Sequence, residues 1–393
     1  MWRIIIISKS LITSGVTLLD LRKISPARSA DEVLSRRFYI LNVFVAVLLM
    51  FAILISISFF GAEAWHGRRQ IALILSGERS QVGWNSSQYL AVKGVCDQLD
   101  CDLIVKENTL PTYSECKAAV DDVAARGASI ILLPNGCHRY DVEKFEKDYP
   151  KVAFFSIESI SALWSTGSYS ILAYEASYLS GILAGLHTKT NKIGFIAPFV
   201  DSEVNQGINA FAIGAQRVNP NVEVLVSWTG GWDKPTIEEQ AVQNLKAEHV
   251  DVLTYHQNSD TIPKAAERTG VDFIAYNAVY PSDAHCIAAL TIDWKAMYRD
   301  LMTFYHSNNI KGAHSAGLSS QMTDLKILSD ITRRERVLLD TAIWEIENGR
   351  SIFSGEIFDR NGVRRCAANE SISFQSLQKN MNWLVKGVRV IGN

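Results

Sequence analysis

Residues 192–233 read KIGFIAPFVDSEVNQGINAFAIGAQRVNPNVEVLVSWTGGWD, and their pattern predicts the fold class of the chain. Its two apolar ends predict buried strands. The helical pattern between them opens at Asp201 and Ser202, which are typical helix-capping residues. Strand, helix and strand in this order make one βαβ unit of a parallel sheet. Ligands bind beside the carboxyl ends of such strands, so Phe199 and Trp232 are candidate ligand contacts.

The same alternation of apolar runs and helical patterns extends from about residue 70 to about residue 292. Nine apolar runs predict strands, at 71–75, 102–105, 129–133, 151–155, 192–196, 222–227, 251–255, 272–276 and 287–291. The runs are continuous rather than alternating, which is typical of strands covered by helices on both faces. The pattern begins anew near residue 192 without a Pro/Gly linker, so we expect an α/β protein of two closely connected lobes.

A single segment accounts for the apolar excess of the chain. Residues 38–62 form 25 consecutive uncharged residues, FYILNVFVAVLLMFAILISISFFGA. As a helix this segment would extend roughly 37 Å, enough to cross a bilayer. It has no polar face, which argues against a buried core helix. We therefore expect one N-terminal transmembrane helix.

The flanking charges predict the orientation of that helix. Residues 1–37 carry seven basic and three acidic side chains, a net charge of 7 − 3 = +4. The positive-inside rule then places 1–37 in the cytoplasm and 63–393 in the periplasm or outside the cell, as a single-pass protein of the inner membrane. The alternative is a secreted periplasmic protein, because the A-x-A pattern at 62–64 would suit signal peptidase if translation began near Val33.

Charge and cysteine content restrict the possible functions. The formal net charge is −2, which disfavours a nucleic-acid partner. All six cysteines follow the apolar segment, where disulfides can persist. None has the spacing of a metal or redox site. A disulfide between Cys286 and Cys366 is one expectation, and buried thiols are the alternative.

Polar and aromatic residues gather where the predicted strands end. Lobe 1 offers Trp84 and Asn85 after its first strand, and Asn135 in a turn after its third. It also offers Glu175, although the helix dipole alone would favour a carboxylate at that helix start. In lobe 2 the candidates are Phe199, Trp232, Asn258, Asn277, Asp293 and Trp294. A ligand cleft needs a few convergent polar groups on an apolar wall, and this set supplies them.

Catalytic motifs are absent from the sequence. It contains no G-x-S-x-G elbow, H-E-x-x-H, phosphate loop or G-x-G-x-x-G. His256 has no partner at a metal-ligand spacing, which favours a structural histidine. No pair of carboxylates suggests general acid–base catalysis. We expect neither an enzyme nor a bound cofactor or metal.

Four segments carry a resemblance to a known family: GWN at 83–85, YLSGILAG at 178–185, GINAFAIGAQRVNP at 207–220 and YN at 276–277. They resemble the basic membrane protein (BMP, PnrA-like) family of solute-binding proteins, best known for its purine-nucleoside receptors. The resemblance implies a type I periplasmic-binding-protein fold, with two Rossmann-like lobes joined by three crossovers. Lobe 1 would comprise about 70–190 and a segment returning after 306. Lobe 2 would comprise about 191–306 and part of the C-terminus.

The resemblance also implies roles for individual residues. Trp84 would stack on a purine-like ring, Asn85 would bond to its edge, and Asn258 would take the place of the family's acidic or amide residue. Ala278, Val279 and Tyr280 follow Asn277, so the Asp and Lys that hold ribose in the nucleoside receptors have no counterpart here. A free base therefore fits at least as well as a nucleoside. No cysteine directly follows the apolar segment, so the lipid anchor usual in the family is also missing.

Three functions follow from these observations, in decreasing order of support. The first is a solute-binding component that closes on a purine-like ligand and delivers it to an ABC permease. The second is a membrane-tethered ectodomain that binds the same ligand and reports it to a signalling partner. The third is a nucleoside-processing enzyme, which the missing catalytic residues disfavour.

Overall fold

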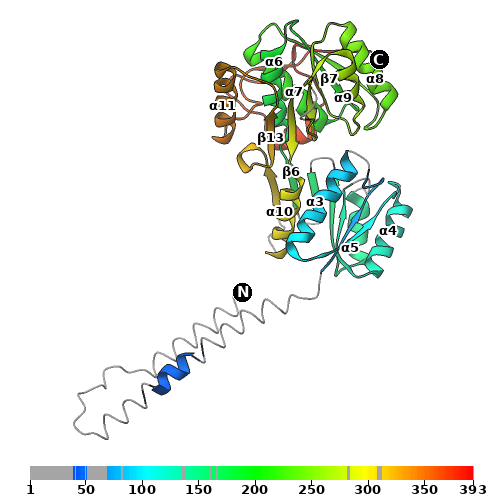
Figure 1. The fold of residues 1–393 in the computed structure, drawn as a ribbon, viewed down its shortest axis with the longest axis vertical. Helices are drawn as coiled ribbons and strands as arrows, with labels where there is room; N and C mark the ends of the chain where they lie inside the picture. Colours follow the sequence, from blue (N-terminus) through cyan, green and yellow to red (C-terminus); the bar gives the residue numbers. More distant parts are fainter. Residues whose placement is uncertain are drawn as a thin grey trace, which may run out of the picture. The chain divides into compact units, whose positions relative to one another are not determined.

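The computed structural model describes Tyr39, 41–48, Met50, 69–80, 83–134, 139–158, 161–164, 167–280, 284–307 and 312–392. The chain divides into two compact units, Met1–Gly67 and Arg68–Asn393 (Figure 1). In the first unit the described residues are helical. The predicted cytoplasmic segment at 1–37, and most of the predicted membrane helix at 38–62, lie outside the described residues. Within the described part of the chain, no helix has both the length and the apolarity to cross a membrane.

Lobe 1 of the second unit is built on a seven-stranded sheet in the order β12-β6-β5-β4-β3-β1-β2. Its strands are β1 (Gln70–Ile74), β2 (Asp102–Lys106), β3 (Ala128–Leu133), β4 (Ala153–Glu158), β5 (Ser161–Trp164), β6 (Gly167–Ile171) and β12 (Gly312–Ala316). Its helices are α3 (Trp84–Leu99), α4 (Tyr113–Ala125), α5 (Arg139–Asp148) and α10 (Trp294–His306). The pairs are parallel except those of β5, which runs antiparallel to both neighbours.

Lobe 2 repeats this design with a seven-stranded sheet in the order β13-β11-β10-β9-β7-β8-β16. Its strands are β7 (Lys192–Ala197), β8 (Glu223–Trp228), β9 (Val252–Tyr255), β10 (Asp272–Tyr276), β11 (Cys286–Ile292), β13 (Thr323–Ile327) and β16 (Val388–Ile391). Its helices are α6 (Ala173–His187), α7 (Ser202–Val218), α8 (Pro235–Ala247), α9 (Thr261–Thr269), α11 (Arg333–Glu347) and α12 (Phe374–Asn380). The turn η2 (Leu318–Ser320) and the short strands β14 (Ile357–Phe358) and β15 (Arg364–Cys366) complete the described elements.

Helices cover both faces of each sheet, which confirms the two-lobed α/β prediction (Figure 1). Strand β1 shows how its sequence achieves this. Ile71 and Leu73 lie in the cluster under α3, whereas Ala72 and Ile74 lie in the cluster under α4. Because side chains alternate along a strand, a continuous apolar run supplies two cores at once.

The chain passes between the lobes three times, after β6, after β11 and after β12. Hydrogen bonds join these crossovers. The Leu172 amide donates to Ala316 at 2.8 Å, and the Asp293 amide donates to Met322 at 2.9 Å. The Glu175 carboxylate accepts the Leu318 amide at 2.8 Å, and burial raises the pKa of that carboxyl group. These bonds make the three crossovers one hinge.

Helix α6 packs on α7 within lobe 2, so the first crossover lies at Leu172 rather than near residue 190. Two glycines permit this packing. A Cβ atom on Gly181 would collide with the backbone carbonyl of Phe211, and one on Gly214 would collide with that of Tyr178. The YLSGILAG and GINAFAIGAQ segments are therefore the two sides of one close helix contact.

Helix α7 also holds the C-terminal segment through buried amide side chains. Asn205 donates to Met381 O at 2.8 Å, and Gln206 donates to Leu377 O at 3.2 Å. Asn209 bonds twice, donating to Trp383 O at 3.0 Å and accepting from Val385 N at 2.8 Å. A buried polar group is stabilising only when it is paired, so this segment is fixed firmly to lobe 2.

We expect Asn209→Ala to lower the free energy of unfolding by about 2–3 kcal/mol, because it leaves the partly buried Trp383 carbonyl and the buried Val385 amide without this partner. Urea denaturation followed by circular dichroism measures the change. Asn244→Ala, on the outer side of α8 where Asn244 accepts from Gln240, is the matched control and should cost less than about 1 kcal/mol. Equal losses in the two variants would contradict the anchoring role of Asn209.

The expected disulfide between Cys286 and Cys366 is wrong, since neither residue is disulfide-bonded. Cys286 belongs to the core cluster beneath α8 and α9, whereas Cys366 belongs to the cluster around α6 and α7. These clusters lie on opposite faces of the lobe 2 sheet, so the sheet separates the two sulfur atoms. Cys116 of α4 is the described cysteine that is in a disulfide.

Candidate functional site

A cleft of about 1370 Å³ lies between the lobes, where strands of both sheets end. Lobe 1 contributes residues that follow β1 and β3, together with serine hydroxyls of α3 and β6. Lobe 2 contributes residues that follow β7, β8, β9 and β10, and one side of α12. The cleft therefore occupies the position at which open α/β sheets bind ligands.

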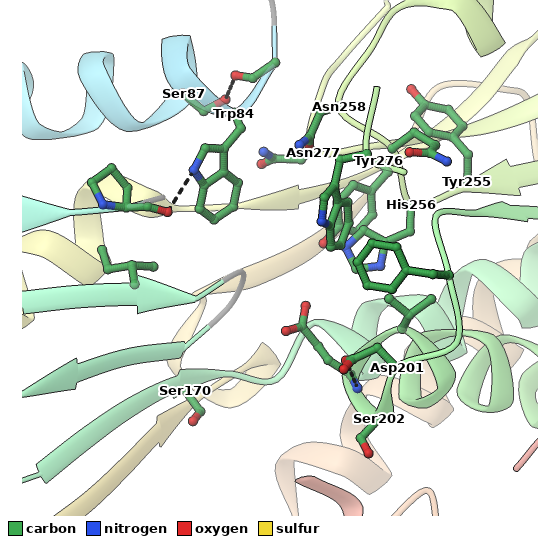
Figure 2. Close-up of a pocket in the computed structure, with 18 of the residues that line it drawn as sticks. Trp84, Ser87, Ser170, Asp201, Ser202, Tyr255, His256, Asn258, Tyr276 and Asn277 are labelled. Carbon is green, nitrogen blue, oxygen red and sulfur yellow. Dashed lines mark hydrogen bonds between the residues drawn. The ribbon is translucent and has the colours of Figure 1, made fainter. Parts of the chain in front are cut away.

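Trp84 forms the aromatic part of the lobe 1 wall. It is the first residue of α3, and its Nε1 donates to Pro134 O at 3.2 Å. Its ring meets that of Trp294 edge to face, with centroids 4.9 Å apart and planes at 75°. Figure 2 shows Trp84 directed into the cavity from lobe 1. With its N–H engaged and its ring braced, Trp84 offers the cleft mainly an aromatic surface.

Four aromatic rings in series form the facing wall on lobe 2. The ring centroids of Phe199 and Trp232 lie 5.4 Å apart, and those of Trp232 and His256 lie 5.2 Å apart. His256 in turn lies 4.2 Å from Tyr276. Each ring comes from the end of a different strand, β7 to β10, so the sheet spaces them along one wall. Figure 2 shows His256 and Tyr276 of this series. A flat apolar ligand would meet aromatic surface on both sides.

His256 is neutral in this wall. Only 7% of the residue is exposed, and burial lowers its pKa from 6.5 to about 3. A neutral imidazole has one N–H donor and one acceptor nitrogen, so it can bond to a polar ligand edge without adding charge. The sequence indicated a structural histidine, whereas the structure places His256 in the cleft.

We expect His256 to make the protein less stable in acid. The unfolded chain binds a proton below pH 6.5 and the folded chain does not until about pH 3. The free energy of unfolding therefore falls as the pH is lowered through this window, by about 1.4 kcal/mol per pH unit from this group. Urea unfolding between pH 7 and pH 4 should show a shallower pH dependence in His256→Gln. The same slope in both proteins would contradict a neutral buried imidazole.

Gln257 adds a buried amide to the same wall. Its Nε2 donates to the Thr229 hydroxyl, which itself donates to Gly231 O at 2.8 Å. Its Oε1 has no hydrogen-bond partner among the described residues, although the side chain lines the cleft and is 3% exposed. The sequence pointed to Asn258 next to it, and both residues line the cleft.

Charged and amide groups lie at the edge of the cleft. Asp201 caps α7 by accepting the Glu203 amide at 2.8 Å, and both residues line the cleft. Helix α12 also brings Gln375, Gln378 and Lys379 to the cleft. Sequence reasoning missed α12, because its approach to the cleft depends on the distant amides of α7. Among the described residues, no group of three or more His, Cys, Asp or Glu side chains is placed to hold a metal.

The structure places the sequence-predicted residues in three groups. Those that line the cleft are Trp84, Phe199, Trp232, Asn258 and Asn277. Those that do not line it are Asn85, Glu175, Asp293 and Trp294. Asn135 lies outside the described residues.

Each residue of the second group has a structural position instead. Asp293 caps α10 by accepting the Ala296 amide at 2.9 Å, and Glu175 braces the hinge. Trp294 lies behind Trp84 and is 4% exposed. Asn85 is in the first turn of α3, where its Oδ1 is enclosed and has no hydrogen-bond partner within the described part of the chain.

Comparison with known proteins identifies the family. A family model described as ABC transporter substrate-binding protein PnrA-like matches residues 68–337. The chain belongs to this family. PnrA-like proteins are substrate-binding proteins rather than enzymes, which agrees with the absence of catalytic motifs.

Two relatives illustrate the range of proteins that this PnrA-like chain resembles. A purine-binding protein of Brucella abortus is 25% identical over 338 residues, which cover 84% of this chain and 95% of the relative. Metabotropic glutamate receptor-like protein F of Dictyostelium discoideum is 28% identical over 207 residues, 51% of this chain. This chain spans 27% of that receptor-like protein.

Solved structures share the fold of the PnrA-like chain. A transcriptional activator of the comK gene from Bacillus halodurans has a TM-score of 0.61 at 17% identity, covering 71% of this chain and 98% of that one. A solute-binding protein of an ABC transporter system from Aeropyrum pernix K1 has a TM-score of 0.60 at 16% identity. The match covers 72% of this chain and 92% of that one. These likenesses concern the two-lobed architecture alone.

Proposed function

We propose that the protein binds a purine base or a nucleoside-like ligand between its lobes and delivers it to an ABC-type importer. The observation that supports this most is the pair of aromatic walls, Trp84 on lobe 1 and the Phe199-to-Tyr276 series on lobe 2. A flat heteroaromatic ring gains from stacking on both, while the amides and the neutral imidazole can bond to its edge. The name of the Brucella relative supports a purine ligand.

Closure of the lobes on the ligand is the mechanism that fits the architecture. The cleft of about 1370 Å³ exceeds the roughly 300–1,000 Å³ typical of small-molecule pockets, so a purine would leave unfilled space. Rotation about the three crossovers would bring the walls onto the ligand. The ligand favours the closed form because only there does it touch both walls.

The location proposed for the ligand-binding unit follows from the N-terminal charges. Residues 63–393 would lie in the periplasm, tethered to the inner membrane by a single helix at 38–62, and a secreted form after signal cleavage is the alternative. A permease in the same membrane would then accept the ligand from the cleft. Protease treatment of spheroplasts tests this location, because an external unit is degraded while the cells remain intact.

A screen of the purified protein by thermal shift and calorimetry tests the ligand class. Purine bases and nucleosides should stabilise the folded protein by mass action and so raise its unfolding temperature. At a ligand concentration a hundredfold above Kd, the free energy of unfolding rises by roughly 2.7 kcal/mol. Pyrimidines, sugars and amino acids serve as comparison ligands. Stabilisation by sugars or amino acids but not by purines would overturn the proposed ligand class.

A second function has its own supporting observation. The relative named metabotropic glutamate receptor-like protein F matches 51% of this chain, which favours a membrane-tethered ectodomain that reports its ligand to a signalling partner. Crosslinking in cells discriminates the two functions. A permease captured only with ligand present supports import, whereas a kinase or cyclase captured in the same way supports sensing.

A further inference from the structure

Asn277 occupies an unusual backbone position on the lobe 2 wall. It follows β10 directly and has φ of +53°, a left-handed conformation that Asn tolerates better than most residues. The backbone N–H of Asn277 donates to Leu290 O at 2.7 Å, which fixes the Asn277 backbone against β11. Left-handed residues other than glycine gather at functional sites, and Asn277 lines the cleft.

The orientation of the Asn277 side chain is determined by Trp294. The Trp294 indole Nε1 lies 3.0 Å from Asn277 Oδ1 and can only donate a hydrogen bond. The side chain must therefore present its oxygen to Trp294. With the amide reversed, two N–H groups would face each other at a tryptophan that is only 4% exposed. The edge-to-face contact with Trp84 at 4.9 Å braces the indole.

The cleft thus gains a hydrogen-bond donor whose orientation is fixed by Trp294, the residue that also packs against Trp84. Once Oδ1 is engaged, the Nδ2 amino group is the part of Asn277 left for a ligand. Trp84 does not compete for the same role, because its own N–H already donates to Pro134 O. Trp294 contacts both Trp84 and Asn277, and both of these residues line the cleft, so stacking and hydrogen bonding would act on the same ring.

We propose that Asn277 Nδ2 donates to a ring nitrogen or carbonyl oxygen on the edge of the flat ligand that stacks on Trp84, and that Trp294 is its positioning residue. This assignment rests on the proposed function. It restricts the ligand class to heteroaromatic rings with an acceptor at that edge. A ring with C–H at the same position is rejected although its shape is unchanged.

Adenine and its 1-deaza, 3-deaza and 7-deaza analogues test the assignment, because each analogue replaces one acceptor nitrogen by C–H. Calorimetry should show that at least one analogue binds the wild-type protein about tenfold to a hundredfold more weakly than adenine. Trp294→Phe keeps the aromatic contact but releases the amide, and should reduce this ratio to less than about threefold. Asn277→Asp replaces the donor by an acceptor in a backbone conformation that Asp also tolerates, and should abolish the preference.

Asn191→Asp, the same substitution at another left-handed asparagine, with φ of +60° and outside the cleft lining, is the matched control and should keep the wild-type ratio. The ratio is measured within each protein, so a general loss of stability does not affect it. If adenine binds the wild type but the ratio is unchanged in Trp294→Phe and Asn277→Asp, the assignment is overturned and the proposed function stands. If neither adenine nor any analogue binds the wild type, the purine function fails and this assignment fails with it.

Discussion

Replacing Trp84 with alanine is expected to raise the Kd of the purine ligand about tenfold to a hundredfold. Stacking of a base on an aromatic side chain contributes about 1–3 kcal/mol, and alanine removes that surface from the lobe 1 wall. Trp84 is suited to this role because Pro134 holds its N–H and Trp294 braces its ring. Calorimetric titration of the variant with adenine measures the loss.

Two further variants separate stacking from folding. Trp344→Ala removes a tryptophan that is 63% exposed on α11, outside the cleft, and should leave Kd unchanged. Trp84→Phe keeps an aromatic face while losing the bond to Pro134, and should recover most of the affinity. If Trp84→Ala binds adenine as tightly as the wild type does, Trp84 is not the stacking residue.

A second large effect is expected from Gly83→Ala. Gly83 caps α3 with φ of +117°, which L side chains rarely adopt, so alanine costs about 1–3 kcal/mol of stability. A Cβ atom there would also collide with the backbone carbonyl of Asn258, in the opposite lobe. We expect this Cβ atom to hold the lobes apart. The Kd for adenine should then rise about tenfold, in addition to the loss of stability. Thermal unfolding and calorimetry measure the two effects separately.

Gly349→Ala provides the control for the backbone cost alone. Gly349 has φ of +85°, and no atom lies within 4 Å of the position that a Cβ atom would take. Alanine at this position therefore strains the backbone without a steric clash. This variant should lose stability and retain the wild-type Kd. The wedge explanation fails if Gly83→Ala and Gly349→Ala bind adenine equally well.

The fold was readable from the sequence because its signal is local. The apolar run of β7 and the capping Asp201 of α7 predict strand and helix without any distant partner. Short elements gave no such signal: β5 is a four-residue strand and β16 another, and each is defined by the strands beside it.

The candidate site was only partly predictable, because a sequence places residues at strand ends but does not give side-chain directions. Trp84 and Trp294 have similar sequence contexts, yet one lines the cleft and the other lies behind it. Glu175 follows a strand as a ligand residue would, but its carboxylate turns to the Leu318 amide in the hinge. The sequence indicated a structural role for His256, because it does not show the two rings that flank it, Trp232 and Tyr276, which come from the ends of other strands.

The three crossovers have a consequence for how this protein is made. Lobe 1 takes its strand β12 and its helix α10 from chain that follows nearly all of the lobe 2 sheet, and β12 pairs with β6 across that distance. A nascent chain cannot finish lobe 1 until most of lobe 2 has left the ribosome. Such long-range pairing slows folding. Neither lobe can therefore be expressed by truncating the chain at one position. An isolated lobe would require a circular permutation that joins its discontinuous segments.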